Sequence, residues 1–204
     1  MTLSAHPSTG VLSDYASGAL RTAPGVVVVA HLQFCPSCRL VVQTFEEVGG
    51  AFLRGSPPEH VGLPVLGRVL RGIEEGARPP GSGSSRRALD QRTSPVGVKF
   101  GARRLLGPGC WFTPICVSHR RDWGVFLFRT VAAPPPHGWP RTALVCVLAG
   151  GFRRGARTYR IGDFGIFPSA DFRRSAALPG GPLVALVAAK WSRTHAWLRR
   201  SSLG

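Results

Sequence analysis

The spacing of one histidine and two cysteines near the amino end constrains this 204-residue chain more than any other feature. His31, Cys35 and Cys38 stand at positions i, i+4 and i+7, which share one face of a continuous helix. Pro36 disfavours a continuous helix directly after Cys35, so we expect the three side chains to gather at a corner between two helices. Thiolate and imidazole groups are the usual ligands of a structural zinc ion.

A structural zinc site has four protein ligands, so one more residue is needed. His6 is the only other histidine or cysteine before residue 55. We therefore expect His6, in a segment that precedes the first helix and folds back, to complete a zinc site with His31, Cys35 and Cys38. A helical group this short has too little core to be stable alone, so zinc binding would contribute directly to its folding.

Three alternatives to zinc remain open for the cysteine pair. A thioredoxin-like redox pair needs a strand–helix–strand context, whereas the residues around Cys35 and Cys38 are predicted to be helical. A disulfide needs an oxidising compartment, but the chain does not open on a basic region followed by a long apolar one. The third alternative is an inert pair of buried thiols. The position of His31, four residues before Cys35, favours zinc over all three.

The residues around this motif predict a small helical domain. We expect helices over 13–20, from Pro24 to Phe34, from Pro36 onward and within 56–75. Val26–Val29 alone would favour a strand, but the ligand spacing favours a helix. On the third helix, apolar side chains recur at helical spacing and form a stripe that must be buried in the domain or against a partner. The stripe consists of Val41, Phe45, Val48 and Phe52.

The second half of the chain predicts an all-β domain. From about residue 96, short apolar segments separated by glycine and proline indicate an antiparallel barrel or sandwich. The candidate strands are Val96–Phe100, Trp111–Cys116, Gly124–Val131, Ala143–Leu148, Thr158–Ile161, Phe164–Phe167 and Leu183–Ala189. We thus divide the chain into a helical domain (1–75), a flexible Gly/Pro/Ser-rich linker (76–95) and a β-barrel domain (96–204) that ends in a short helix at 191–203.

The net charge of +16 is confined to one part of the chain. Residues 1–55 are neutral, so 56–204 carry the whole excess, which could attract nucleic acid or an acidic protein. Because the arginines occur as scattered pairs and not as one helical stripe, we interpret them as solvated surface and do not expect direct nucleic-acid binding. The longest apolar stretches are near ten residues, too short for a membrane-spanning helix, and we expect a cytoplasmic protein.

The N-terminal motifs together resemble the zinc-binding domain of ChrR-type anti-sigma factors. The resemblance covers residues 6–53 and rests on four pieces in the expected order: His6, Ser13–Leu20, the His31-x3-Cys35-x2-Cys38 motif and Phe45–Ala51. It implies one zinc held by His6, His31, Cys35 and Cys38. It also implies a 1:1 complex with an extracytoplasmic-function sigma factor, whose access to RNA polymerase is blocked. We therefore expect a transcriptional repressor, in a stress response, and not an enzyme.

The family's C-terminal half is a cupin barrel, and residues 105–190 resemble it through Gly107-Pro108-Gly109, segment 144–152 and segment 159–164. The cupin metal pattern has two histidines two residues apart, an acid and a third histidine. His137 fits the first place, but Trp139 and Ala143 occupy the next two, and Arg173 or a neighbour occupies that of the third histidine. One imidazole cannot hold a divalent ion, so we expect no metal in the barrel.

The alternative function is a cupin-type metalloenzyme or a small-ligand-binding cupin. An unusual metal site built from His119 and His137 would support the enzyme. No carboxylate pair, glycine-rich phosphate loop or serine nucleophile elbow is found, so we name no catalytic residue. Cys146 lies in an apolar segment and is predicted to be core, whereas Cys110 is a candidate reactive thiol.

Overall fold

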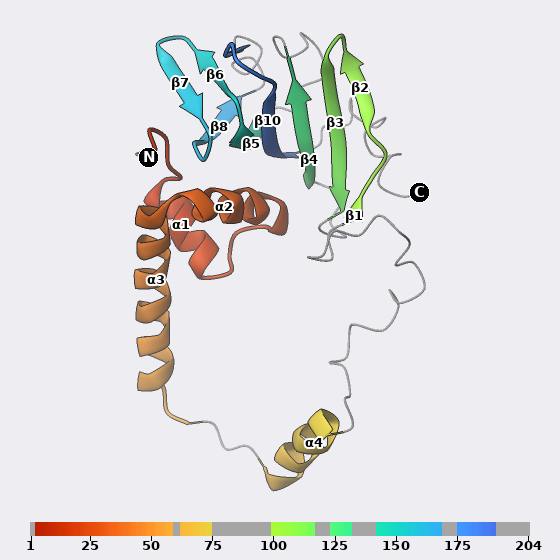
Figure 1. Cartoon of the computed structure of the whole chain (residues 1–204). Helices are drawn as coiled ribbons and strands as arrows, with labels where there is room; N and C mark the ends of the chain where they lie inside the picture. Colours follow the sequence, from red (N-terminus) through yellow and green to blue (C-terminus); the bar gives the residue numbers. More distant parts are fainter. Residues whose placement is uncertain are drawn as a thin grey trace.

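The computed structural model describes residues 3–58, 62–74, 99–116, 123–131, 142–168 and 175–190. Within them, helices occupy the N-terminal part and strands the C-terminal part (Figure 1). The predicted fold class, helices followed by an antiparallel β-barrel, is confirmed. The predicted linker at 76–95 and the tail helix at 191–203 lie outside the described residues, as do His119, His137, Trp139 and Arg173.

The N-terminal part contains α1 (Thr9–Ala16), α2 (Thr22–Phe34), α3 (Pro36–Gly55) and α4 (Leu63–Glu74). The valine run lies in α2, as the ligand spacing predicts. The first helix both begins and ends earlier than the predicted 13–20. The Ser8 side chain, and not that of Ser13, caps it by accepting a hydrogen bond from the Val11 N–H. α3 continues through Gly49 and Gly50 to Gly55.

The C-terminal part contains two antiparallel sheets. The strands are β1 (Lys99–Phe100), β2 (Arg104–Gly107), β3 (Cys110–Cys116), β4 (Trp123–Thr130), β5 (Thr142–Ala149), β6 (Gly151–Arg154), β7 (Arg157–Arg160), β8 (Phe164–Pro168), β9 (Ser175–Ala177) and β10 (Leu183–Lys190). The larger sheet has the order β1-β3-β4-β10-β5-β8, with β2 paired to β3, and the smaller has the order β7-β6-β9. The sequence prediction missed β2, β6 and β9, which are short and lack a run of apolar residues.

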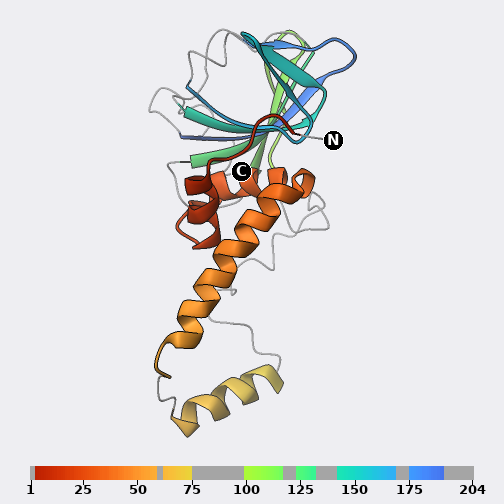
Figure 2. The ribbon, with the colours of Figure 1, turned by 90° about the vertical axis from the view of Figure 1, so that its left-hand side faces the viewer.

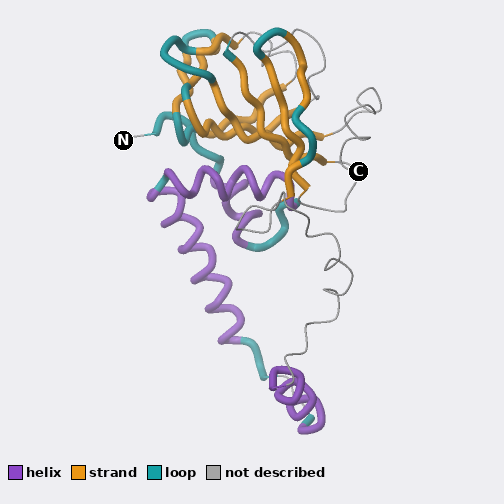
Figure 3. Tube along the Cα trace, turned by 45° about the vertical axis from the view of Figure 1, so that its right-hand side comes forward, coloured by secondary structure: helices purple, strands orange, loops and turns teal. Residues whose placement is uncertain are grey.

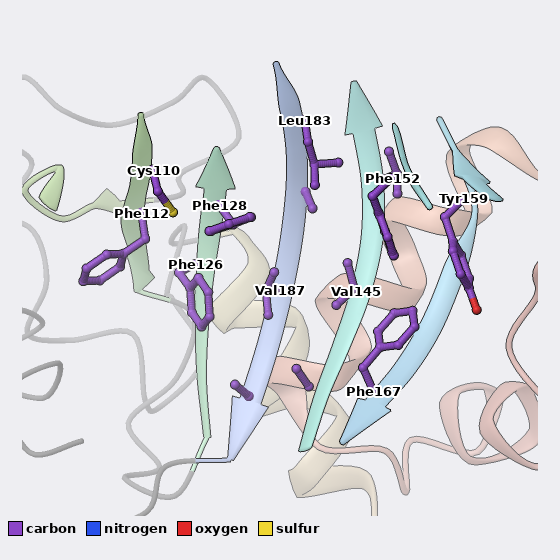
Figure 4. Close-up of a cluster of buried hydrophobic side chains, with 14 residues drawn as sticks. Cys110, Phe112, Phe126, Phe128, Val145, Phe152, Tyr159, Phe167, Leu183 and Val187 are labelled. Atoms are coloured by element: carbon purple, nitrogen blue, oxygen red, sulfur yellow. The ribbon is translucent and has the colours of Figure 1, made fainter. Parts of the chain in front are cut away.

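The barrel interior is packed with aromatic and aliphatic side chains (Figure 4). Phe152 stacks on Tyr159 with ring centroids 4.7 Å apart, and Phe167 meets both rings edge-on. Val145 and Val187 lie in the same cluster. The residues that follow or precede them in the strands, such as Leu144, Cys146 and Leu186, belong to a second cluster on the outer face of the sheet.

This second cluster joins the helices to the barrel. Val27 and Val28 of α2 are fully buried in it, together with Val125, Leu144 and Leu186 of the barrel. Figures 1 and 3 show α2 lying against the barrel strands. Strands β4, β5 and β10 are thus buried on both faces, which explains why β5 and β10 are nearly continuous apolar runs.

The far half of α3 extends away from this shared core (Figure 2). Val48 is half exposed and Phe52 is 75% exposed, although Phe45, from the same predicted stripe, packs against the shared core. On α4, Leu66, Val69, Leu70 and Ile73 are likewise at least half exposed. The chain therefore presents two amphipathic helices whose apolar faces it leaves largely uncovered.

The shared core predicts a sharp contrast between two neighbouring valines of α2. Val28→Ala removes two methyl groups from a fully buried site and should lower the free energy of unfolding by about 2 kcal/mol. Val29→Ala, at a position that is 40% exposed, should change it by less than about 0.5 kcal/mol. Urea unfolding of the zinc-loaded chain measures both. Equal losses in the two variants would contradict the packing of α2 against the barrel.

Candidate metal centre

The four predicted ligands come from three separate segments of the chain. His31 lies in the last turn of α2, Cys35 separates α2 from α3, and Cys38 lies in the first turn of α3. His6 precedes α1. One donor atom from each of the four residues lies within 4.8 Å of the others. The structure thus brings all four together, with His6 exposed and the other three buried.

The corner between α2 and α3 positions the two sulfur atoms. Cys35 has an extended backbone that ends α2, and Pro36 occupies the first position of α3, where its missing N–H is not needed. The Cys35 Sγ accepts a hydrogen bond from the Cys38 N–H at 3.4 Å. The His6 Nδ1 lies 3.3 Å from the Cys35 Sγ and 3.4 Å from the Cys38 Sγ. These three side chains therefore converge on a common point.

Each histidine is oriented by a backbone carbonyl on its other ring nitrogen. The His31 Nδ1 lies 2.6 Å from the Gly162 oxygen, and since a carbonyl only accepts, Nδ1 carries the proton. The His6 Nε2 faces the Leu3 oxygen at 3.3 Å in the same way, which leaves the His6 Nδ1 lone pair toward the sulfurs. Metal-bound histidines are usually held by such a hydrogen bond on the nitrogen that is not a ligand.

The remaining nitrogen of His31 provides a test of whether the site fits a metal ion. The His31 Nε2 is buried and has no hydrogen-bond partner among the described residues. Burying such a group without a partner costs about 1–3 kcal/mol. An ion bound at Nε2 would remove this cost, and two nitrogens with two sulfurs are a donor set that suits tetrahedral zinc. The residues present therefore fit a zinc ion.

The pKa values of His31 and Cys38 are shifted mainly because these side chains are removed from water. Burial lowers the pKa of His31, so its imidazole is neutral at pH 7 and its lone pair is available. Burial, reinforced by a hydrogen bond with Cys35, raises the pKa of the Cys38 thiol to about 12. In the metal-free chain Cys38 is therefore protonated at neutral pH, and metal binding has to displace this proton.

Sequence reasoning missed two residues that support the site, Gly162 and Asp163. Both lie in segment 159–164, which resembles part of a cupin barrel, and no sequence signal links Gly162 to a histidine 131 positions earlier. Cys146 is fully buried, as predicted. Cys110 is also buried, and burial raises its pKa to about 11, which argues against a reactive thiol.

Comparison with known proteins supports the sequence resemblance. No protein-family model matches the chain. The anti-sigma-E factor ChrR of Cereibacter sphaeroides is 27% identical over 172 residues, which are 81% of this chain and 80% of ChrR. A chain in the crystal structure of Rhodobacter sphaeroides SigE in complex with the anti-sigma ChrR matches with a TM-score of 0.68 and 24% identity, covering 92% of this chain and 100% of that one.

An RmlC-like cupin from Shewanella frigidimarina matches more remotely, with a TM-score of 0.35 and 13% identity over 46% of this chain and 86% of that one. The resemblance of the chain to ChrR is thus confirmed over most of its length by sequence and over nearly all of it by fold. Among the described helices, none has the length and apolar character needed to span a membrane.

The raised pKa of Cys38 predicts that zinc affinity depends on pH. Because the Cys38 thiol must lose a proton to become a ligand, apparent affinity should rise by at least about tenfold per pH unit between pH 6 and pH 8. Competition against a chromophoric chelator, corrected for the chelator's own protonation, measures this slope. Cys38→Ser should bind zinc more weakly and with a shallower slope, whereas an affinity independent of pH in the unsubstituted chain would contradict thiolate ligation.

Proposed function

We propose that this chain is a zinc-dependent anti-sigma factor, which holds an extracytoplasmic-function sigma factor in an inactive 1:1 complex in the cytoplasm and so represses transcription. One observation carries the proposal: four metal-ligand side chains converge at the base of α3, a helix whose apolar face is left exposed. ChrR, to which the chain is similar, is named an anti-sigma-E factor and has been crystallised with SigE.

His6, His31, Cys35 and Cys38 would hold the zinc ion. When bound, the ion would supply a fixed link between the N-terminal segment, the end of α2 and the start of α3. Cys35 and Cys38 set the angle at which α3 leaves the shared core, because they lie on the two sides of the α2–α3 corner. His31 anchors this corner to α2, whose valines are buried against the barrel.

The docking surface consists of the exposed apolar side chains of α3 and α4. An amphipathic helix buries such a face in an apolar groove of its partner. Phe52 and Leu53 are more than 70% exposed on α3, and Ile73 is 70% exposed on α4. A sigma factor seated between these helices would have its polymerase-contacting surfaces covered, which accounts for repression.

We infer that the chain does not act as an enzyme. The described part of the barrel interior is built mainly of aromatic and aliphatic side chains, an arrangement suited to packing. Metal analysis distinguishes this inference from a cupin-type metalloenzyme. One zinc per chain that is lost in Cys35→Ser supports the anti-sigma factor, whereas a second metal that is lost in His137→Ala would support the enzyme.

The proposal predicts that complex formation depends on the two cysteines. The chain should co-elute at 1:1 with an extracytoplasmic-function sigma factor from the same genome on gel filtration, and Cys35→Ser/Cys38→Ser should abolish this complex. Cys110→Ser, at a buried cysteine of the barrel, is the matched control and should keep it. Normal binding by the double variant would show that docking does not need the metal centre.

The docking surface itself predicts a second contrast, between opposite faces of α3. Phe52→Asp places a charge in the apolar face and should weaken sigma-factor binding by about 2 kcal/mol, or roughly thirtyfold. Gln43→Asp places the same charge on the opposite face, because nine residues correspond to two and a half helical turns. Calorimetric titration with the sigma factor measures both affinities. Equal affinities would exclude this face of α3 from the interface.

A further inference from the structure

The two histidines of the metal centre are both connected to one turn of the barrel, at Gly162 and Asp163 between β7 and β8. This turn is held firmly by the neighbouring strand β5. The Gly162 N–H donates to the Val147 oxygen at 2.8 Å, and the Val147 N–H donates to the Asp163 oxygen at 3.1 Å. The backbone positions of Gly162 and Asp163 therefore follow those of the barrel.

The Asp163 side chain is hydrogen-bonded to the segment that carries His6. Asp163 is buried, and its carboxylate accepts hydrogen bonds from the Ser4 N–H (2.8 Å), the Ala5 N–H (3.1 Å) and the Ser4 hydroxyl (3.1 Å). The fourth donor is the Arg160 N–H, at 2.8 Å. Three of the four bonds thus go to the two residues directly before His6. Hydrogen bonds to a carboxylate are among the stronger ones in proteins.

The backbone completes this attachment. The Phe164 N–H donates to the Ala5 oxygen at 2.9 Å, so residues 4 and 5 are fixed to the start of β8 by both their N–H groups and a carbonyl. The exposed His6 has no helix of its own to hold it, since α1 begins only at Thr9. Its approach to the sulfurs is therefore determined by the barrel.

Gly162 orients His31, as Asp163 holds the segment that carries His6. Its oxygen accepts a hydrogen bond from the His31 Nδ1–H and so directs the unpaired Nε2 toward the other ligands. Its φ angle of 88° favours glycine, and a Cβ atom there would lie 2.7 Å from the Phe34 Cβ and 2.8 Å from the Leu3 Cδ2. The turn thus packs directly against the end of α2 and against the N-terminal segment.

We propose that Asp163 is a positioning residue of the metal centre, which clamps the N-terminal segment so that the barrel, and not the helices, delivers His6 to the site. The cysteines are contributed by the α2–α3 corner, while both histidines are held by the Gly162–Asp163 turn. A displacement of this turn is therefore transmitted to two of the four ligands. This inference rests on the zinc centre proposed above but does not depend on the identity of the protein partner.

The test uses the full chain loaded with Co²⁺, whose visible spectrum reports the ligand set, and with Zn²⁺. Asp163→Asn should release zinc to a chelating dye about 10- to 100-fold faster, as expected when a group that orients a ligand is lost. Its cobalt spectrum should change in the same way as that of His6→Ala. Val187→Ala is the matched control, because it perturbs the barrel interior without removing any hydrogen bond of the clamp and should keep the original spectrum.

Should Asp163→Asn fail to fold, Ser4→Pro removes two donors of the clamp, the N–H and the hydroxyl of an exposed residue, and should show the same spectral change. The proposal is overturned if the clamp variant that folds retains the original release rate and spectrum, or if Val187→Ala reproduces the change. The zinc content of the unsubstituted chain is measured first. Absence of zinc there would refute the metal centre itself, an outcome distinct from failure of the clamp.

Discussion

The architecture of this protein depends on the convergence of four donor atoms from three segments of the chain. Two of these segments, α2 and α3, are neighbours, and their corner places Cys35 and Cys38 together by local geometry alone. The third, the N-terminal segment, is held in place by hydrogen bonds to a part of the barrel that is distant in sequence. The unpaired, buried Nε2 of His31 marks the point where these segments meet. A single ion at that point would satisfy the nitrogen and hold the three segments together.

The barrel packs together with α1, α2 and the first half of α3 around one shared core. Strands β4, β5 and β10 contribute alternate residues to the barrel interior and to the core shared with α2. The far half of α3 has no such support, and its apolar face is exposed. The chain thus combines a rigid base with a projecting amphipathic helix, an arrangement that suits capture of an apolar partner and agrees with the similarity to ChrR.

The sequence predicted those features of the structure that depend on the spacing of residues close together in the chain. The interval from His31 to Cys38 indicated a helix corner with a metal site, and it outweighed the strand preference of Val26–Val29. The same interval could not indicate that Gly162 and Asp163 support the site. Gly162 is hydrogen-bonded to a residue 131 positions away, and Asp163 to one 159 positions away. The short strands β2, β6 and β9 were not predicted for a similar reason. They form because they pair with neighbouring strands, whereas their own composition does not indicate a strand. The start of α1 was misplaced because Ser8 and Ser13 are equally good caps by residue type.

X-ray absorption at the zinc edge tests the central claim most directly, because it counts ligand types without any partner or activity. For the purified full chain with one zinc bound, the account requires two sulfur ligands at about 2.3 Å and two nitrogen ligands at about 2.0–2.1 Å, in a closed tetrahedral site. A chain that folds without zinc, or a bound zinc that lacks the two sulfur ligands, would contradict it.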